Sequence, residues 1–268
     1  MKGRRDGSSR REFLRAAGAA LGLAAGSRAV AILALPLSPS SPAKPLYDWT
    51  AHEYAMLIDL ARCIGCGHCV QACKLENDVP REPTYFRTWV ERYIITKPKL
   101  GSGAARGETL VDCPNGGING YPEAPVLKEE IQHSFFVPKL CNLCKDSPCT
   151  QVCPVGATFD APDGAVLIDP KYCIGCGFCI QACPYGCRFI NPETKTVEKC
   201  TLCYHRITQG LTTACSEACP TGARTLVDLK NPKDPVHEFL RNNSVQVLKP
   251  QMATGSKVFY KDLDGAVR

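Results

Sequence analysis

The apolar residues of this chain are gathered in short runs that stand next to loops rich in glycine, proline and cysteine. Five mostly apolar runs of three or four residues occur at 55–58, 135–137, 165–168, 188–190 and 225–227. Runs of this length, bounded by turn residues, predict short β-strands. Residues 70–75 and 180–185 are predicted as short helices. A mixture of short strands and short helices predicts an α+β fold.

A longer, weakly apolar stretch lies near the start of the chain, at residues 16–37. It follows Ser-Arg-Arg-Glu-Phe-Leu-Arg at 9–15, which looks like a twin-arginine export motif, and small residues at 41–43 suit a signal peptidase. We therefore predict that residues 1–43 are a twin-arginine signal peptide and that the protein is exported to the periplasm. A basic amino-terminal helix or an uncleaved anchor of about 20 residues is the alternative. After Ala43 we expect a soluble chain.

Sixteen of the 18 cysteines fall into four groups of four. Groups one and three share the spacing C-x2-C-x2-C-x3-C; they are Cys63, Cys66, Cys69, Cys73 and Cys173, Cys176, Cys179, Cys183. Groups two and four have longer middle gaps; they are Cys141, Cys144, Cys149, Cys153 and Cys200, Cys203, Cys215, Cys219. A proline follows the last cysteine of groups two, three and four, whereas Lys74 follows that of group one.

Groups one and three are copies of one another. Of the 17 positions from Leu57 to Cys73, 12 are identical at the positions 110 residues later, from Leu167 to Cys183. This identity indicates duplication of one module.

The spacing favours [4Fe–4S] clusters, each of which needs four thiolates. Three cysteines in a tight loop bind three iron corners, and the fourth points away to the other cluster of a pair, as in two-cluster ferredoxins. Structural zinc sites use separated C-x2-C hooks, so zinc is the weaker reading. A disulfide framework does not require this spacing, and the chain has no C-x3-C-x2-C run of the radical-enzyme kind.

If the fourth cysteine of each group ligates the cluster of its partner group, with groups one and four paired and groups two and three paired, four ligand sets result, which we call tetrads A to D. Tetrad A is Cys63, Cys66, Cys69 and Cys219; tetrad B is Cys73, Cys200, Cys203 and Cys215. Tetrad C is Cys141, Cys144, Cys149 and Cys183; tetrad D is Cys153, Cys173, Cys176 and Cys179. The spacing indicates four clusters but does not by itself show which partner each fourth cysteine finds.

The formal charge of +6 does not indicate a nucleic-acid partner. Residues 1–43 hold seven Lys/Arg and two Asp/Glu, so removing them leaves +1. Four clusters, each with a core of about +2 and four thiolates, bring the loaded protein to about −7. A cation precedes each cysteine group within two residues, namely Arg62, Lys139, Lys171 and Lys199. These cations raise the cluster potentials or are solvated at the surface.

The order of the four groups, with the long gap in the last, resembles the four-cluster iron–sulfur subunits of dimethyl sulfoxide reductase and polysulfide reductase type molybdopterin oxidoreductases. The resemblance covers roughly residues 54–229. It implies the same pairing of groups and a chain of clusters that passes single electrons. It also implies a molybdenum or tungsten catalytic subunit and a quinol-reactive membrane subunit, which would hold the protein at the outer face of the cytoplasmic membrane.

We expect two fused ferredoxin-like modules with an inserted loop region and an extended tail. The expected parts are 1–43, the signal peptide; 44–73, a first half-module; 74–132, an insertion; 133–199, a central module; 200–230, a last half-module; and 231–268, the tail. Within the insertion we predict a strand pair around 85–95 and then a glycine-rich solvated loop. The tail is predicted to hold a short helix and then extended segments, and a docking arm is one hypothesis for it.

The expected function is electron transfer, with no substrate site on this chain, because no residues outside the cysteines form an acid–base or nucleophile set. One alternative is the equivalent subunit of a hydrogenase or multihaem cytochrome complex; another is a zinc-stabilised scaffold. Cys187 is expected to be a small buried residue and Cys113 a free thiol. His68 and His205 lie near ligand cysteines but are expected to be exposed or to contact ligands, because each group already supplies four thiolates.

Overall fold

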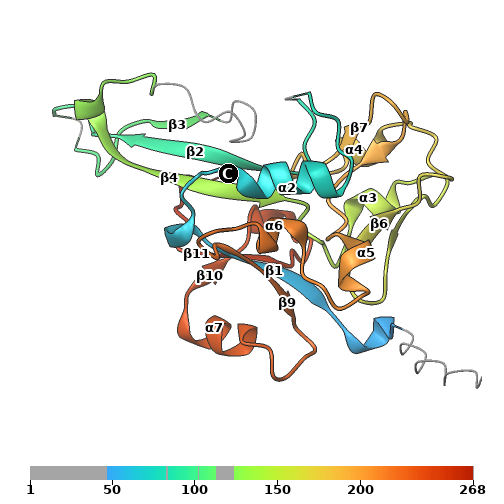
Figure 1. Ribbon diagram of the computed structural model, residues 1–268. Helices are drawn as coiled ribbons and strands as arrows, with labels where there is room; N and C mark the ends of the chain where they lie inside the picture. Colours follow the sequence, from blue (N-terminus) through green and yellow to red (C-terminus); the bar gives the residue numbers. More distant parts are fainter. Residues whose placement is uncertain (1–46, 83, 102, 113–123, 268) are drawn as a thin grey trace, which may run out of the picture. The chain divides into compact units, whose positions relative to one another are not determined.

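The computed structural model describes residues 47–82, 84–101, 103–112 and 124–267, and Figure 1 shows their arrangement. Residues 1–43, predicted to be a signal peptide, and Cys113 lie outside these ranges. The strands are β1 Tyr54–Asp59, β2 Thr88–Thr96, β3 Thr109–Asp112, β4 Ile131–Leu140, β5 Thr158–Asp160, β6 Val166–Ile168, β7 Phe189–Ile190, β8 Val197–Glu198, β9 Arg224–Asp228, β10 Val245–Gln246 and β11 Val258–Lys261. The helices are α2 His68–Glu76, α3 Pro148–Gln151, α4 Phe178–Gln181, α5 Tyr204–Ile207, α6 Ala214–Glu217 and α7 Val236–Asn242. The predicted mixture of strands and short helices is confirmed.

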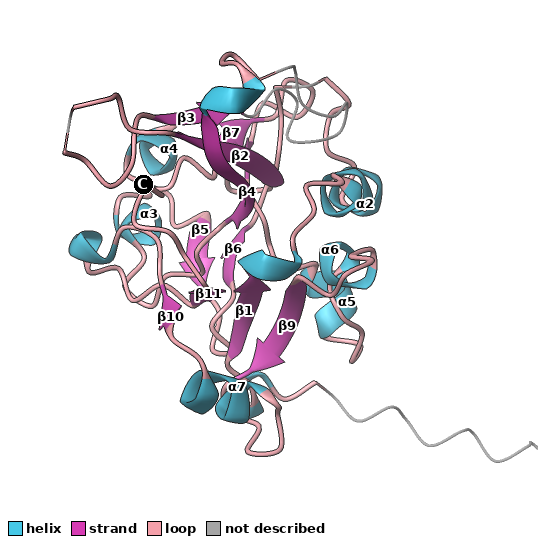
Figure 2. Ribbon diagram, turned by 90° about the vertical axis from the view of Figure 1, so that its left-hand side faces the viewer, coloured by secondary structure: helices cyan, strands magenta, loops and turns pink. Residues whose placement is uncertain are grey.

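The largest sheet has the order β10-β11-β1-β9. Its central strand β1 runs parallel to β11 and antiparallel to β9, and all six of its residues are buried. Side chains alternate between the two faces of a strand. Ala55 and Leu57 therefore pack with Val236 and Phe239 of α7, which lies beside β1 and β9 in Figure 2. Met56 and Ile58 point to the other face, into the core that contains the cysteines.

A second sheet has the order β3-β2-β4. The predicted strand pair around 85–95 is wrong, because these residues form the single strand β2. The partners of β2 are β3 and β4, and its pairing with β4 runs from Thr88 opposite Leu140 to Thr96 opposite Ile131. The inner end of this pair is buried and leads directly into Cys141, so the sheet positions the first cysteine of group two.

Two small hairpins complete the described strands. β5 pairs with β6 between groups two and three, and β7 pairs with β8 after group three. Each of the five predicted strands overlaps an observed one, namely β1, β4, β6, β7 and β9. Short apolar runs were therefore a correct signal, although too short to show which strands pair.

Proline decides where the helices beside the cysteines end. α3, α4 and α6 have four residues each and end two residues before Cys153, Cys183 and Cys219, each of which precedes a proline. The residue before a proline is disfavoured in the helical conformation. The short helix predicted over 180–185 is therefore present with different bounds, because α4 spans Phe178–Gln181 and ends before Cys183. Group one has Lys74 instead of proline, and the nine-residue α2 continues through Cys73 to Glu76, covering the predicted 70–75.

The end of the chain belongs to the main sheet. The short helix predicted in the tail is present as α7, but β11 then lies between β10 and β1, with Met56 opposite Val258. Val258 and Tyr260 are fully buried, and the Tyr260 hydroxyl donates to the Pro138 carbonyl at 3.0 Å. The docking-arm hypothesis is therefore wrong for β11. Within the described ranges, no helix is long and apolar enough to cross a membrane.

Alanine substitutions at two glycines of group three would distinguish the effect of backbone strain from that of a steric clash. Gly175 and Gly177 both have positive φ, +69° and +76°, and alanine costs about 1–2 kcal/mol in this region. A Cβ on Gly175 would lie 2.4 Å from the Lys195 carbonyl oxygen, whereas one on Gly177 has no neighbour within 4 Å.

We expect Gly175→Ala to lower the free energy of unfolding by about 1–3 kcal/mol more than Gly177→Ala does, and thermal unfolding measures this. Equal unfolding midpoints for the two variants would contradict this packing.

Candidate iron–sulfur sites

Tetrad A is brought together around one cavity. Cys63 and Cys66 lie in the loop before α2, Cys69 lies in α2, and Cys219 follows α6. All four line one cavity, with Val90 of β2 and Pro138 of β4 on its wall. Cysteines 150 residues apart in the sequence thus meet because β9, which follows Cys219, pairs with β1, which precedes Cys63.

Tetrad B surrounds a second cavity. Cys73 comes from α2, Cys215 from α6, and Cys200 and Cys203 from the segment before α5. Helices α2 and α6 contact each other, which places Cys73 opposite Cys215. Met56 and Leu202 supply apolar wall and are almost fully buried.

Tetrad C lines a third cavity. Cys141 follows β4, Cys149 lies in α3, and Cys183 follows α4. Each of the three cavities is lined by all four cysteines of one tetrad. Their donor sets of four sulfurs fit four iron corners of a cluster.

Tetrad D lies nearer the surface. Cys179 of α4 is buried against Cys149 and Val166, Cys173 accepts the Val197 amide at 3.4 Å, and Cys176 is exposed. Cys153 follows α3, which contacts α4. Cys173 and Cys176 lie in the loop before α4, so the contact of α3 with α4 brings the segments that carry tetrad D together.

Successive tetrads are neighbours in the order A, B, C, D. Cys69 of tetrad A interacts electrostatically with Cys215 of tetrad B. Cys200 of tetrad B interacts in the same way with Cys141 of tetrad C. Cys149 of tetrad C packs in one apolar cluster with Cys179 of tetrad D. The four sets form a series rather than a compact group.

Burial raises the pKa of seven of the sixteen grouped thiols. It raises the pKa of Cys200 to about 12 and those of Cys63 and Cys144 to about 11. Removing a thiolate from water disfavours its charge, so these groups ionise only when something positive binds them. Such sites favour a cationic occupant.

The last cysteines of groups two, three and four behave differently, because the turn after them supplies donors. Gly156, Gly186 and Gly222 have φ of +64°, +65° and +65°, so the same Cys-Pro-x-Gly turn occurs three times. The pKa of Cys183 is lowered to about 5, first by a hydrogen bond with the Cys187 side chain and then by backbone amides, against the effect of burial. In Cys153 and Cys219 burial raises the pKa, but hydrogen bonds outweigh it and the net direction is downward.

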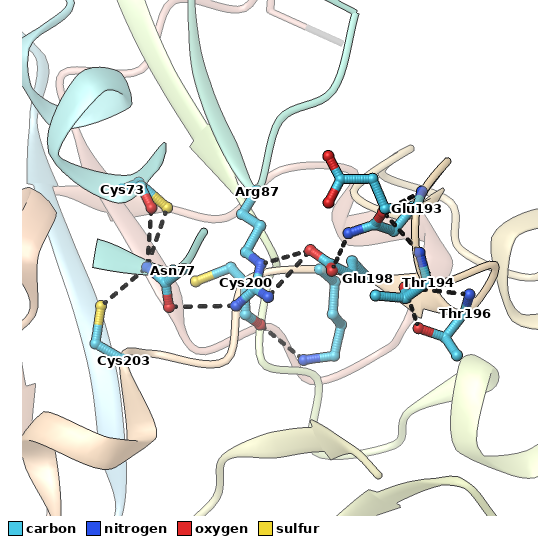
Figure 3. Close-up of polar contacts among 11 residues, drawn as sticks. Cys73, Asn77, Arg87, Glu193, Thr194, Thr196, Glu198, Cys200 and Cys203 are labelled. Carbon is cyan, nitrogen blue, oxygen red and sulfur yellow. Dashed lines mark hydrogen bonds and ion pairs between the residues drawn. The ribbon is translucent and has the colours of Figure 1, made fainter. Parts of the chain in front are cut away.

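Cys73 lacks this turn, and a side chain takes its place. The Asn77 amide group lies 3.7 Å from both the Cys73 and the Cys203 sulfur and donates to the Cys73 carbonyl at 3.0 Å. Arg87 fixes its orientation, donating to the Asn77 carbonyl oxygen at 3.2 Å while pairing with Glu198 at 3.0 Å (Figure 3). Sequence reasoning missed Asn77, although the absence of proline after Cys73 marked the position as different.

The four cations predicted near the clusters divide into two pairs. Lys139 and Lys199 are buried, whereas Arg62 and Lys171 are exposed. Exposed charges are screened by water, so the surface reading holds for the second pair.

The remaining candidates fall where sequence reasoning expected them. His68 and His205 are exposed, and His205 lies 2.7 Å from Glu76. Cys187 is 2% exposed, as expected of a small core residue.

Two buried arginines were missed. Arg188 and Arg224 are 6% and 2% exposed, and each comes five residues after a closing cysteine, in Cys-Pro-x-Gly-x-Arg. This repeat was the available signal. Arg224 lines the cavity of tetrad A, and within the described ranges its Nε and Nη1 atoms are buried without a hydrogen-bond partner. Buried polar atoms are nearly always paired, so these donors fit an acceptor such as cluster sulfide in the cavity.

Comparison with known proteins supports the same chemistry. The 4Fe-4S dicluster domain family matches residues 132–229, and the 4Fe-4S binding domain family matches residues 54–75. These ranges contain all sixteen grouped cysteines, so the prediction of [4Fe–4S] clusters is confirmed over zinc.

Several relatives are similar over most of their length. A tetrathionate reductase subunit of Salmonella typhimurium is 41% identical over 261 residues, which cover 97% of this chain and 90% of that protein. The protein of the same name from Archaeoglobus fulgidus is 41% identical over 80% of this chain and 84% of its own length. A putative dimethyl sulfoxide reductase iron-sulfur subunit of Halobacterium salinarum is 34% identical over 78% of each chain. This chain therefore belongs to the family of iron–sulfur electron-transfer subunits of dimethyl sulfoxide reductase type molybdopterin oxidoreductases.

Proposed function

We propose that tetrads A to D hold four [4Fe–4S] clusters, through which electrons pass in that order or its reverse. The carrying observation is that all four cysteines of each of tetrads A, B and C line one cavity, while cysteines of neighbouring tetrads lie close enough to interact electrostatically. Tetrad D completes the series through Cys149 and Cys179. When bound, each cluster supplies a site that accepts and releases one electron.

The chain's own residues give this path two properties. The inner sulfurs are shielded, since Cys200 and Cys141 are both 8% exposed, so electrons are kept away from solvent oxidants. The outer tetrads reach the surface through Cys66 and Cys176, which are exposed. Tetrads A and D are thus the two ends at which partner subunits deliver or remove electrons.

The fold supports two fused ferredoxin-like modules. Groups two and three lie close in sequence around the β5–β6 hairpin and form the module of tetrads C and D. Groups one and four are far apart in sequence, and the pairing of β1 with β9 joins them as the module of tetrads A and B. The insertion contributes β2, which contacts α2 of that module and pairs with β3.

The partners of this protein are a molybdopterin catalytic subunit and a quinol-reactive membrane subunit. The names of the relatives support a reductase complex, and two of those described above are named for tetrathionate reductase. A sulfur oxyanion of this kind is therefore the first substrate to test for the catalytic partner. We place no substrate site at the three cavities described above, because each is lined by the four cysteines of one tetrad.

Exchange of the fourth cysteine is testable with single ligand variants. Cys219→Ser should remove the same electron paramagnetic resonance signal as Cys63→Ser and lower the iron content by about a quarter, from about 16 atoms. Cys187→Ser is the matched control, because Cys187 is buried beside tetrad C but is no ligand, and it should retain all the iron. If Cys219→Ser instead removed the signal that Cys173→Ser removes, the assignment of tetrads A and D would be wrong.

Export by the twin-arginine route accounts for the leader, since that route carries proteins that have folded with their cofactors. Replacing both Arg10 and Arg11 with lysine should leave the protein in the cytoplasm with its iron in place. Cell fractionation with an iron assay measures this. Unchanged periplasmic delivery of the variant would contradict the proposal.

The complex itself is tested by anaerobic affinity purification from mildly solubilised membranes, followed by metal analysis. We expect molybdenum or tungsten, a polytopic partner and quinol-dependent reduction of a substrate such as tetrathionate. Iron with nickel or with haem, and neither molybdenum nor tungsten, would instead indicate the hydrogenase or cytochrome alternative.

A further inference from the structure

Three buried cations lie at the three junctions between successive tetrads. Arg224 interacts electrostatically with Cys69 of tetrad A and with Cys215 of tetrad B. Lys199 interacts with Cys200 of tetrad B and with Cys149 of tetrad C. Arg188 interacts with Cys149 of tetrad C and with Cys179 of tetrad D. We call Arg224, Lys199 and Arg188 the junction cations.

Each junction cation is held rigidly. Arg224 Nη2 donates to the Thr88 hydroxyl at 2.7 Å. Arg188 donates through Nη1 to the Thr158 hydroxyl at 3.3 Å and through Nη2 to the Cys149 sulfur at 2.7 Å. The Lys199 ammonium donates to the carbonyls of Val166 and Cys200.

None of the junction cations is neutralised by a carboxylate in these contacts. Lys199 is 1% exposed, and its two acceptors are both carbonyls. The other buried lysine near a cysteine group, Lys139, differs because it pairs with Glu91 at 2.7 Å. Burying a charge costs several kcal/mol unless an opposite charge lies close. The sulfurs on either side are the negative partners that these three cations have.

The two arginines stand at equivalent positions of the two modules. Arg188 and Arg224 occupy the same place in Cys-Pro-x-Gly-x-Arg, so each module has one arginine between its two tetrads. The corresponding position of group two is Thr158, which accepts the Arg188 hydrogen bond. Lys199, immediately before Cys200, lies where the modules meet.

We propose that the junction cations are a series of fixed positive charges that alternate with the clusters and raise the reduction potentials of the two clusters on either side. This inference rests on the proposed function, because it assumes a cluster in every tetrad. One-electron reduction takes an oxidised cluster with four thiolates from a net charge of about −2 to about −3, with no proton needed. A nearby positive charge in a medium of low polarity stabilises the reduced form most. The same charge also weakens the repulsion between electrons on adjacent clusters.

The test is a redox titration of the purified, cluster-loaded protein, followed by electron paramagnetic resonance. Signals are assigned beforehand with one ligand variant for each tetrad, namely Cys63→Ser, Cys73→Ser, Cys141→Ser and Cys173→Ser. At a fixed potential, Arg224→Gln should lower the reduced-to-oxidised ratio of clusters A and B at least tenfold, a shift of about 59 mV per tenfold for one electron. Clusters C and D should change less than threefold. Arg188→Gln should lower the reduced-to-oxidised ratio of clusters C and D and change that of clusters A and B less than threefold. Lys199→Gln should lower the ratio of clusters B and C.

Exposed cations provide the matched controls. Arg62 beside tetrad A, with a side chain 62% exposed, and Lys171 beside tetrad D each carry the same charge in water. Arg62→Gln and Lys171→Gln should change every ratio less than threefold, because water screens them. If they shifted the potentials as much as the buried variants did, or if all four clusters moved together, the proposal would be overturned.

Arg224→Lys covers the case in which Arg224→Gln takes up no iron. It keeps the charge but not the guanidinium fork, so clusters A and B should stay within threefold of the wild-type ratio. A tenfold fall in that variant would show that hydrogen bonding rather than charge acts, and would overturn the proposal. Failure of the proposed function is visible separately, since the wild-type protein would then lack four reducible clusters.

Discussion

The sixteen grouped cysteines between Cys63 and Cys219 must all carry negative charge when they ligate iron. The need to stabilise this charge inside the protein constrains the rest of the structure. Burial opposes ionisation, as the raised pKa of Cys200 shows, while hydrogen bonds favour it: the Cys187 side chain first and backbone amides second lower the pKa of Cys183. The turns after the closing cysteines, the bridging amide of Asn77 and the buried cations all supply positive ends of dipoles or full charges. These groups stabilise the negative charge of the buried sulfurs.

Much of the small-scale architecture follows from the residue after each closing cysteine. Proline ends α3, α4 and α6 before the cysteine and leaves backbone N–H groups free to face its sulfur. Where lysine stands instead, α2 continues, its N–H groups are used within the helix, and the Asn77 side chain takes over. The closing cysteine of every group thus has hydrogen-bond donors near its sulfur, from backbone amides in three groups and from the Asn77 side chain in group one.

The sequence contained the chemistry more completely than the topology. The cysteine spacing predicted the cluster type, and apolar runs predicted five strands that overlap observed ones. The partners of those strands depend on contacts distant in sequence, so the place of β11 beside β1 and of β2 beside β4 could not be foreseen. Lys199 was among the cations noted in the sequence, but its burial was not visible there. The repeated motif that Arg188 and Arg224 share was visible in the sequence, but their burial beside the cysteine sulfurs depends on the fold and was not.

The central claim is that one chain holds four clusters, and a joint count of iron and acid-labile sulfide on anaerobically purified protein tests it most directly. The account predicts about 16 of each per chain, because each cubane contributes four. A reproducible value of about eight, with all sixteen grouped cysteines intact, would contradict it, because two of the tetrads would then hold no cluster. Zinc in place of iron would contradict the account altogether.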